Sequence, residues 1–195
     1  MSASPDAPTS ITSLLELYER RGDEHYGEDV TQRSHALQCA ALARADGAPD
    51  ELVAAALLHD VGHFLSGERP SGWRDDVDDD RHEALGARVL ASLFGARVAA
   101  PVALHVTAKR WRCAVDAPYL TALSATSRAT LTAQGGPLTD TECERFAAHP
   151  AFRDAVRLRE WDDAAKDPAA RPGPMREHEP LLTGLAERAL DATQS

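Results

Sequence analysis

Apolar residues recur along this chain at helical spacing, and no segment shows the strict alternation of a half-buried strand. The first such segment begins after Ser10 and has its apolar positions about one helical turn apart: Ile11, Leu14, Leu15, Leu17 and Tyr18. No internal repeat and no second domain is visible. The pattern predicts an all-α fold, a compact helical bundle in which residues 1–195 form one domain and residues 1–10 are flexible.

Glycine and proline mark the expected boundaries of the next helices. We expect a second helix that ends at Gly47 and a third that opens at Pro49 and delivers His59-Asp60. A fourth and a fifth are expected over about 80–94 and about 96–112, separated by a glycine.

The second half of the chain is predicted to be helical as well. Asp116 is the expected N-cap of a sixth helix that ends near residues 135–136, and Thr139 with Glu142 has the form of a capping box for a seventh. A helix after Pro150 carries Asp162, residues 167–174 contain too much proline to be helical throughout, and a last amphipathic helix covers about 178–192.

The pair His59-Asp60 closes an apolar run over residues 52–58 and is followed directly by Val61-Gly62-His63. Burying an imidazole and a carboxylate costs several kcal/mol unless each group has a partner. A metal ion can serve as the partner of both groups. This pair therefore predicts a metal site inside a helical core.

Further residues with metal-binding side chains lie on both sides of this pair: His35 upstream, and His82, His105 and Asp162 downstream. Together with His59 and Asp60, they are too many for one closed tetrahedral zinc site. They suit two first-row metals that share the Asp60 carboxylate, and such donors suit iron, manganese, cobalt or zinc. Apart from these candidate ligands and His63, the chain has three histidines that are expected to be solvated surface residues: His25, His149 and His178.

The order His, His-Asp, Asp on helices resembles the HD-domain superfamily of metal-dependent phosphohydrolases, and the two extra histidines resemble its dinuclear branch. Segments spread over residues 11–180 are similar to the PhnZ-like mixed-valent diiron oxygenases of that superfamily: 26–28, 35–40, 57–63, 105–110, 134–137 and 159–162. The His-x-x-x-Lys, Gln-Gly-Gly-Pro and Arg-x-Trp-Asp segments are more specific than the HD order, because ordinary HD phosphohydrolases do not share them as a set.

The resemblance implies a compact HD-domain helical bundle and an oxidoreductase of phosphonate catabolism. The implied enzyme is a dioxygenase that cleaves the C–P bond of a small α-hydroxyphosphonate, such as 2-amino-1-hydroxyethylphosphonate, and releases phosphate. Its implied cofactor is a pair of iron ions in the Fe(II)/Fe(III) state, with O2 as co-substrate. By this resemblance His35, His59, Asp60 and Asp162 hold one iron, and Asp60, His82 and His105 hold the second.

Candidate anion-binding residues lie one helical turn from candidate ligands. Lys109 follows His105 by four residues and Arg159 precedes Asp162 by three, so each pair shares a helical face. An ammonium and a guanidinium fork can hold phosphonate oxygens, although Lys109 can also be a surface lysine. The resemblance implies that the substrate-binding residues include both of these and three others: His63, Ser127 and Thr130. His63, Lys109 and Arg159 are the implied catalytic residues.

The segment from Gly22 to Glu28 contains two glycines and is expected to move. The PhnZ-like enzymes have Tyr-x-Gly-Glu on this loop, where the tyrosine occupies an iron in the absence of substrate and the glutamate binds the substrate amine. Here Glu28 aligns, but the tyrosine position holds His25, and Tyr26 follows. Either residue can be the resting-state ligand of such a gate, or neither.

The net charge of −10 argues against a nucleic-acid partner, and no apolar run is long enough for a membrane span. Three scattered cysteines and the lack of a signal-like N-terminus suggest a cytoplasmic protein. Of these, Cys39 is expected to be a small core residue. The acidic run over residues 75–80 is predicted to be a solvated connector. The oligomeric state is left open.

Two other functions remain compatible with these residues. The same two metals can activate a bridging water and hydrolyse a small phosphoester or a nucleotide. A regulatory HD module without turnover is the other alternative, although all six candidate ligands are present. No aromatic cluster for a nucleobase is evident, unless Trp73 and Trp111 form one.

Overall fold

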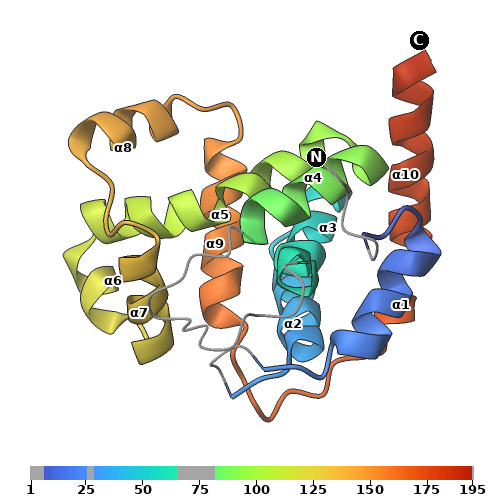
Figure 1. The fold of residues 1–195 in the computed structure, drawn as a ribbon, viewed down its shortest axis with the longest axis horizontal. Helices are drawn as coiled ribbons and strands as arrows, with labels where there is room; N and C mark the ends of the chain where they lie inside the picture. The colour runs from blue at the N-terminus through green and yellow to red at the C-terminus, as the bar shows by residue number, and fades with distance from the viewer. Residues whose placement is uncertain (1–6, 26–28, 66–81, 195) are drawn as a thin grey trace.

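The structure, a computed structural model, describes residues 7–25, 29–65 and 82–194 (Figure 1). All regular elements in these residues are helices, which confirms the predicted all-α fold. The elements are α1 (Ile11–Arg21), α2 (Gln32–Ala45), α3 (Asp50–Leu58), the 3-10 helix η1 (Val61–Phe64), α4 (His82–Phe94), α5 (Ala96–Val115), α6 (Ala117–Ala122), α7 (Ala125–Ala133), α8 (Asp140–Ala147), α9 (Phe152–Ala164), the 3-10 helix η2 (Met175–His178) and α10 (Glu179–Gln194).

The centre of the bundle is α3, whose residues from Leu52 to Leu58 are all buried. A helix that is apolar all round must be enclosed by others, and α2, α5, α9 and α10 pack around it. Figure 1 shows α1 and α10 on one side of this centre and α6, α7 and α8 on the other. None of the helices in the described residues combines the length and the apolar character needed to cross a membrane.

A second, smaller apolar cluster joins α5, α8 and α9. In it the ring of Trp111 lies edge-on to Phe152, with ring centroids 5.0 Å apart, and Phe146 completes the group. The side chain of Trp111 therefore packs inside the fold, which argues against a nucleobase platform there. Trp73 and the acidic run 75–80 lie outside the described residues.

Most predicted helix boundaries are confirmed. The chain enters α1 at Ser10, and Thr139 and Glu142 form the predicted capping box of α8. The single sixth helix was wrong. Leu123 is extended (φ −55°, ψ 138°), and the Ser124 hydroxyl accepts the N–H of Ser127, so a new helix begins after α6.

The Gln-Gly-Gly-Pro segment forms a turn after α7. Gly135 and Gly136 both have positive φ angles, 92° and 74°, which favour glycine. Arg110 Nε donates to the carbonyl of Gly136 at 2.8 Å, and Leu138 N–H donates to the carbonyl of Arg110 at 3.2 Å. The turn is thus attached to α5, and α7 is held against the helix that carries His105 and Lys109.

Candidate metal centre

His59 and Asp60 lie at the point where the buried helix α3 ends. The helix stops at Leu58, His59 is its C-cap, and Asp60 is the residue before η1. His59 is fully buried, and its Nδ1 lies 2.9 Å from the carbonyl oxygen of Ala56. Because a carbonyl only accepts, Nδ1 must donate, so the lone pair of Nε2 points away from it and is available to a metal.

Two other histidines are oriented in the same way. His35 Nδ1 donates to the carbonyl of Ala165 at 2.9 Å, and His105 Nδ1 donates to the carbonyl of Val102 at 2.7 Å. In both side chains the proton is held on Nδ1 by a backbone acceptor. Each therefore presents Nε2 as a potential metal ligand.

A first group of candidate ligands consists of His35, His59, Asp60 and Asp162. The two Nε2 atoms are 3.2 Å apart, and Asp162 Oδ1 lies 3.3 Å from His35 Nε2 and 3.8 Å from His59 Nε2. Asp60 Oδ2 lies 3.7 and 3.4 Å from the same two nitrogens. Neighbouring donors bound to one ion at about 2.1 Å are about 3 to 3.5 Å apart. The spacing of these atoms is thus close to that of a single metal site.

A second group lies on the other side of Asp60. His82 Nε2 and His105 Nε2 are 3.1 Å apart, and Asp60 Oδ1 lies 3.7 and 3.8 Å from them. Asp60 therefore directs one carboxylate oxygen toward each histidine pair. This is the arrangement that a carboxylate needs in order to bridge two metals.

The facing nitrogens require a cation. In the first group both Nδ1 atoms donate, so two neutral imidazoles would direct their lone pairs at each other across 3.2 Å. Burial alone would lower the pKa of His59, but the charge of Asp60 and other neighbours raises it to about 9. Burial alone would raise the pKa of Asp60, yet the imidazoles of His59, His63 and His82 hold it below its usual value. A metal ion satisfies the same demand for positive charge.

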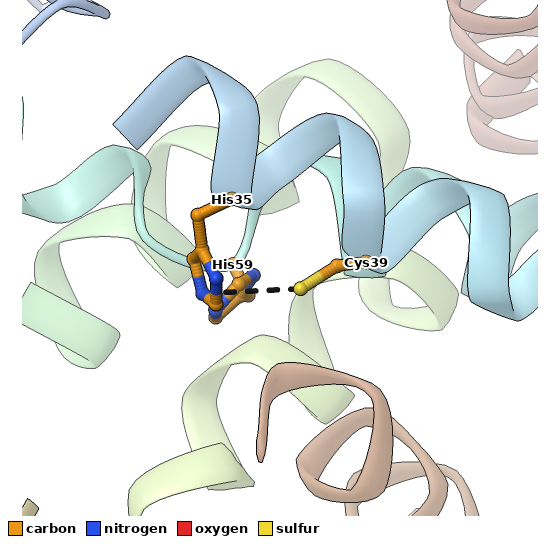
Figure 2. Close-up of side chains that lie close together, drawn as sticks. All are labelled: His35, Cys39 and His59. Carbon is orange, nitrogen blue, oxygen red and sulfur yellow. Dashed lines mark hydrogen bonds between the residues drawn. The ribbon is translucent and has the colours of Figure 1, made fainter. Parts of the chain in front are cut away.

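Cys39 lies beside the first group, as Figure 2 shows. Cys39 is fully buried, as expected. It follows His35 by one turn of α2, and its Sγ is 3.8 Å from His35 Nε2. The ligand atoms of His35, Cys39 and His59 all lie within 4.8 Å of one another. Asp162 Oδ1 approaches His35 Nε2 more closely, at 3.3 Å, which favours the carboxylate as the metal donor.

His63 flanks the second group. Its ring stacks on that of His82 with centroids 3.8 Å apart and planes at 17°. His63 Nε2 also lies 3.9 Å from Asp60 Oδ1. The side chain is 16% exposed, as much as that of Asp60 and more than those of the four candidate histidines, so it can reach a molecule bound beside the second group.

Lys109 is buried, with 4% of its surface exposed, so the surface-lysine alternative is wrong. Its Nζ donates to Thr130 Oγ1 at 3.0 Å, which joins α5 to α7. Burial and the nearby Arg159 guanidinium lower the pKa of Lys109 to about 8. Ser127, one turn before Thr130, is also buried. The structure thus brings together three of the predicted anion-binding residues.

Arg159 is used differently from the free fork that the sequence predicted. Its Nη1 forms an ion pair with Asp162 Oδ2, 2.7 Å away, and its Nη2 donates to Asp163 Oδ1. Nε is buried and has no hydrogen-bond partner in the described part of the chain. Two of its three nitrogens therefore contact carboxylates on its own helix.

The family assignment follows from sequence comparison. Residues 33–134 match the HD domain family. A protein of Gimesia maris named hydroxymethylphosphonate dioxygenase is 45% identical over 166 residues, which cover 85% of this chain and 83% of the relative. The chain belongs to the HD-domain family.

A second relative has a related name. The 1-hydroxy-2-(trimethylamino)ethylphosphonate dioxygenase (glycine-betaine-forming) of Leisingera caerulea is 41% identical over 151 residues, 77% of this chain and 76% of the relative. A protein of uncharacterised function from Acanthamoeba polyphaga mimivirus is 30% identical over 159 residues, 80% of this chain and 73% of the relative. The predicted membership in the phosphonate-dioxygenase branch is thereby confirmed.

Most of the predicted gate residues lie outside the residues that the structure describes. Tyr26 and Glu28 are outside the described residues, and so is Gly27. His25 is exposed and lines a surface cavity of about 330 Å³ with Leu37, Arg171 and other residues from the start of α2 and the segment after α9. Which residue acts as a resting-state ligand stays a prediction.

One histidine assignment was wrong. His149 is exposed as expected, but His178 in η2 is buried. Its Nδ1 accepts a hydrogen bond from Arg44 Nη2 at 3.2 Å. Burial and the charge of Arg44 lower the pKa of His178 to about 4, so it is a neutral packing residue between η2 and α2.

Sequence reasoning missed Lys166, the second of the chain's two lysines. Its Nζ lies 3.5 Å from Ser127 Oγ. The segment that carries it is fixed to α2, since Gln38 Nε2 donates to the carbonyl of Asp167 and Asp167 N–H donates to Gln38 Oε1, each at 3.1 Å. The rarity of lysine, with only Lys109 besides it in the sequence, is a signal that points to this residue.

Proposed function

We propose that this HD-domain protein is a dioxygenase that binds two iron ions and oxidatively cleaves the C–P bond of a small α-hydroxyphosphonate. The observation that carries the proposal is the position of Asp60, whose two carboxylate oxygens face two separate histidine pairs. The names of two relatives above 40% identity support the reaction class.

The donor set fits iron. Four imidazoles and two carboxylates are the nitrogen and oxygen donors that suit non-haem iron. In this proposal His35, His59, Asp60 and Asp162 hold one ion, and Asp60, His82 and His105 hold the other. The bound pair supplies activation of O2 and a Lewis acid for the substrate hydroxyl.

The phosphonate is held by the cationic and hydroxyl groups around α7. Lys109 is fixed by Thr130, and Lys166 reaches Ser127, so two ammonium groups converge on one helix. Arg159 adds a buried N–H at Nε. A phosphonate dianion needs several such donors when it leaves water. His63, on the open side of the second histidine pair, orients the substrate from the metal side.

The chemistry balances for the simplest substrate. Hydroxymethylphosphonic acid and O2 contain the same atoms as formic acid and phosphoric acid together. The C–P bond breaks, the carbinol carbon is oxidised to a carboxyl group, and O2 is reduced. The relative named glycine-betaine-forming has a product with a carboxylate as well. A substituent at C1, such as the aminomethyl group of 2-amino-1-hydroxyethylphosphonate, leaves this balance unchanged.

Oxygen dependence tests this proposal against phosphoester hydrolysis, which can use the same two metals without O2. Iron-loaded protein supplied with hydroxymethylphosphonate should release phosphate in air and none under anaerobic conditions. Phosphate released from a phosphoester under anaerobic conditions, with none from the phosphonate in air, would favour the hydrolase.

The lowered pKa of Lys109 predicts a pH-dependent affinity. In the free protein its ammonium is present below about pH 8 and is lost as the pH rises through that value. Because an anion binds the ammonium, the Kd for hydroxymethylphosphonate should be constant near pH 7 and about tenfold weaker at pH 9. Anaerobic titration calorimetry at several pH values measures this.

Lys109→Met is the matched variant for this test, since the methionine side chain has a similar length and no charge. Its affinity should be weaker at pH 7, by about 1.5–3 kcal/mol. The loss between pH 7 and pH 9 should then largely disappear. If the variant showed the same alkaline loss as the wild type, the titrating group would have to be another one.

A further inference from the structure

Asp163 is a charged residue next to the candidate ligand Asp162 and is not itself a candidate ligand. Both carboxylates lie one turn after Arg159 on α9, at spacings of three and four residues, so all three face the same side of the helix. Arg159 contacts each of them with a different Nη nitrogen. The guanidinium is thus held between Asp162, a candidate metal ligand, and Asp163, which is not one.

Asp163 is itself held by two other helices. Its Oδ2 accepts a hydrogen bond from the hydroxyl of Tyr119 on α6 at 2.7 Å and lies 3.3 Å from Arg112 Nη1 on α5. The guanidinium of Arg112 lies over the ring of Tyr119, 4.0 Å from its centroid. Burial raises the pKa of Tyr119, so its hydroxyl keeps the proton that it donates. Asp163 therefore has a fixed position.

The Nε–H of Arg159 has no hydrogen-bond partner among the described residues. Its side chain is 95% buried, with 5% exposed, and its Nε–H makes no hydrogen bond within the residues described. A buried donor without an acceptor is costly, and a phosphonate oxygen bound beside Nε–H would satisfy it. The nearby Lys109 is the residue whose pKa this guanidinium lowers, so the two cations share one region.

We propose that Asp163 is a positioning residue for substrate binding. Together with Tyr119 and Arg112, it fixes the guanidinium of Arg159 so that Nη1 stays on Asp162 and Nε–H is presented to the phosphonate. This inference rests on the proposed function.

The physical reason is that a guanidinium paired with Asp162 alone can form a stronger ion pair than the one observed. Without Asp163, both Nη nitrogens of Arg159 can turn to Asp162 and form a bidentate pair. That rotation would carry Nε–H away from its present direction. A bidentate pair would also engage Asp162 Oδ1, the oxygen that faces His35 and His59. Asp163 thus keeps the donor toward the substrate separate from the donor toward the metal ligand.

A double-mutant cycle tests the proposal. The Kd of hydroxymethylphosphonate is measured by anaerobic calorimetry on iron-loaded wild type, Asp163→Asn, Asp163→Ala, Arg159→Ala and Asp163→Ala/Arg159→Ala. We expect about tenfold weaker binding in Asp163→Ala and a loss at least as large in Arg159→Ala. The double variant should bind no more weakly than Arg159→Ala alone, because Asp163 acts through Arg159.

Two further readouts separate positioning from general damage. In air, the KM for the phosphonate should rise about tenfold in Asp163→Ala while kcat changes by less than about threefold, and the iron content should equal that of wild type. Tyr119→Phe removes one hydrogen bond to Asp163 and should show a smaller loss, about threefold. Asp154→Ala, at an exposed position of the same helix, is the control and should bind as wild type does.

The outcomes are distinguishable. Wild-type affinity in both Asp163 variants, or losses that multiply in the double variant, would overturn the positioning role. If Asp163→Ala does not fold, Asp163→Asn decides in the same cycle. A wild type that binds no phosphonate would overturn the proposed function, and this inference with it.

Discussion

Replacement of Asp60 by alanine is expected to lower the iron content from two ions per chain to none. Among the described residues, Asp60 alone has a carboxylate oxygen in each candidate group, 3.4 to 3.8 Å from the histidine nitrogens. Its loss removes a counter-charge from both imidazole pairs and leaves Asp162 as the remaining candidate carboxylate of the first group. We expect the free energy of unfolding to fall by about 3–5 kcal/mol, the cost of removing one partner from a buried charged group. Metal analysis and thermal unfolding measure both effects.

His82→Ala is the matched comparison for this result. His82 belongs to the second group alone, where its Nε2 lies 3.1 Å from His105 Nε2. The variant should keep about one iron per chain and a folded first group. If Asp60→Ala and His82→Ala lost the same amount of metal, the shared-carboxylate arrangement would be contradicted.

Replacement of Gly62 by alanine is expected to displace His82 and to destabilise the protein by about 3 kcal/mol, at the upper end of overpacking effects. A Cβ at Gly62 would collide with the carbonyl oxygen of His82 and lie 2.5 Å from its carbonyl carbon. From the other side, a Cβ at Gly86 on α4 would lie 3.2 Å from Gly62 N. The two glycines therefore allow η1 and α4 to approach closely enough to place His82 beside Asp60.

We expect Gly62→Ala to lose the second metal and to retain much of the first. Gly47→Ala is the control, because Gly47 has a φ of +63° but open space around the position of its Cβ. It should cost about 1–2 kcal/mol through backbone strain alone, with both metals kept. A Gly62→Ala protein with two irons and the wild-type melting temperature would show that the close approach is not needed.

The helical fold was predicted from the periodicity of apolar residues, and most helix boundaries were predicted from strong start and stop signals. Ser10, Gly47 and Thr139 mark boundaries that depend on local backbone chemistry, and these predictions hold. The break between α6 and α7 was missed, since a serine such as Ser124 is compatible with a helix interior as well as with an N-cap. Only the extended conformation of Leu123 decides between them.

The candidate site was predicted less evenly. The six candidate ligands were found because a charged pair ends an apolar helix, and the structure brings all six together around Asp60. The use of Arg159 was misjudged, although Asp162 and Asp163 stand one turn after it in the sequence. The burial of His178 was out of reach, because it depends on Arg44, which is 134 residues away. Lys166 had only the rarity of lysine as a signal, since the residue that it contacts, Ser127, is 39 residues away.

The central claim is that the metals at Asp60 use O2 to break a C–P bond, and a stoichiometric measurement tests it most directly. Iron-loaded protein is given hydroxymethylphosphonate, and O2 consumed, formate formed and phosphate released are counted in the same sample. The account predicts one formate and one phosphate for each O2, and none of these products in the metal-free protein. Phosphate formed without consumption of O2, or O2 consumed by the folded, iron-loaded protein without phosphate, would contradict it.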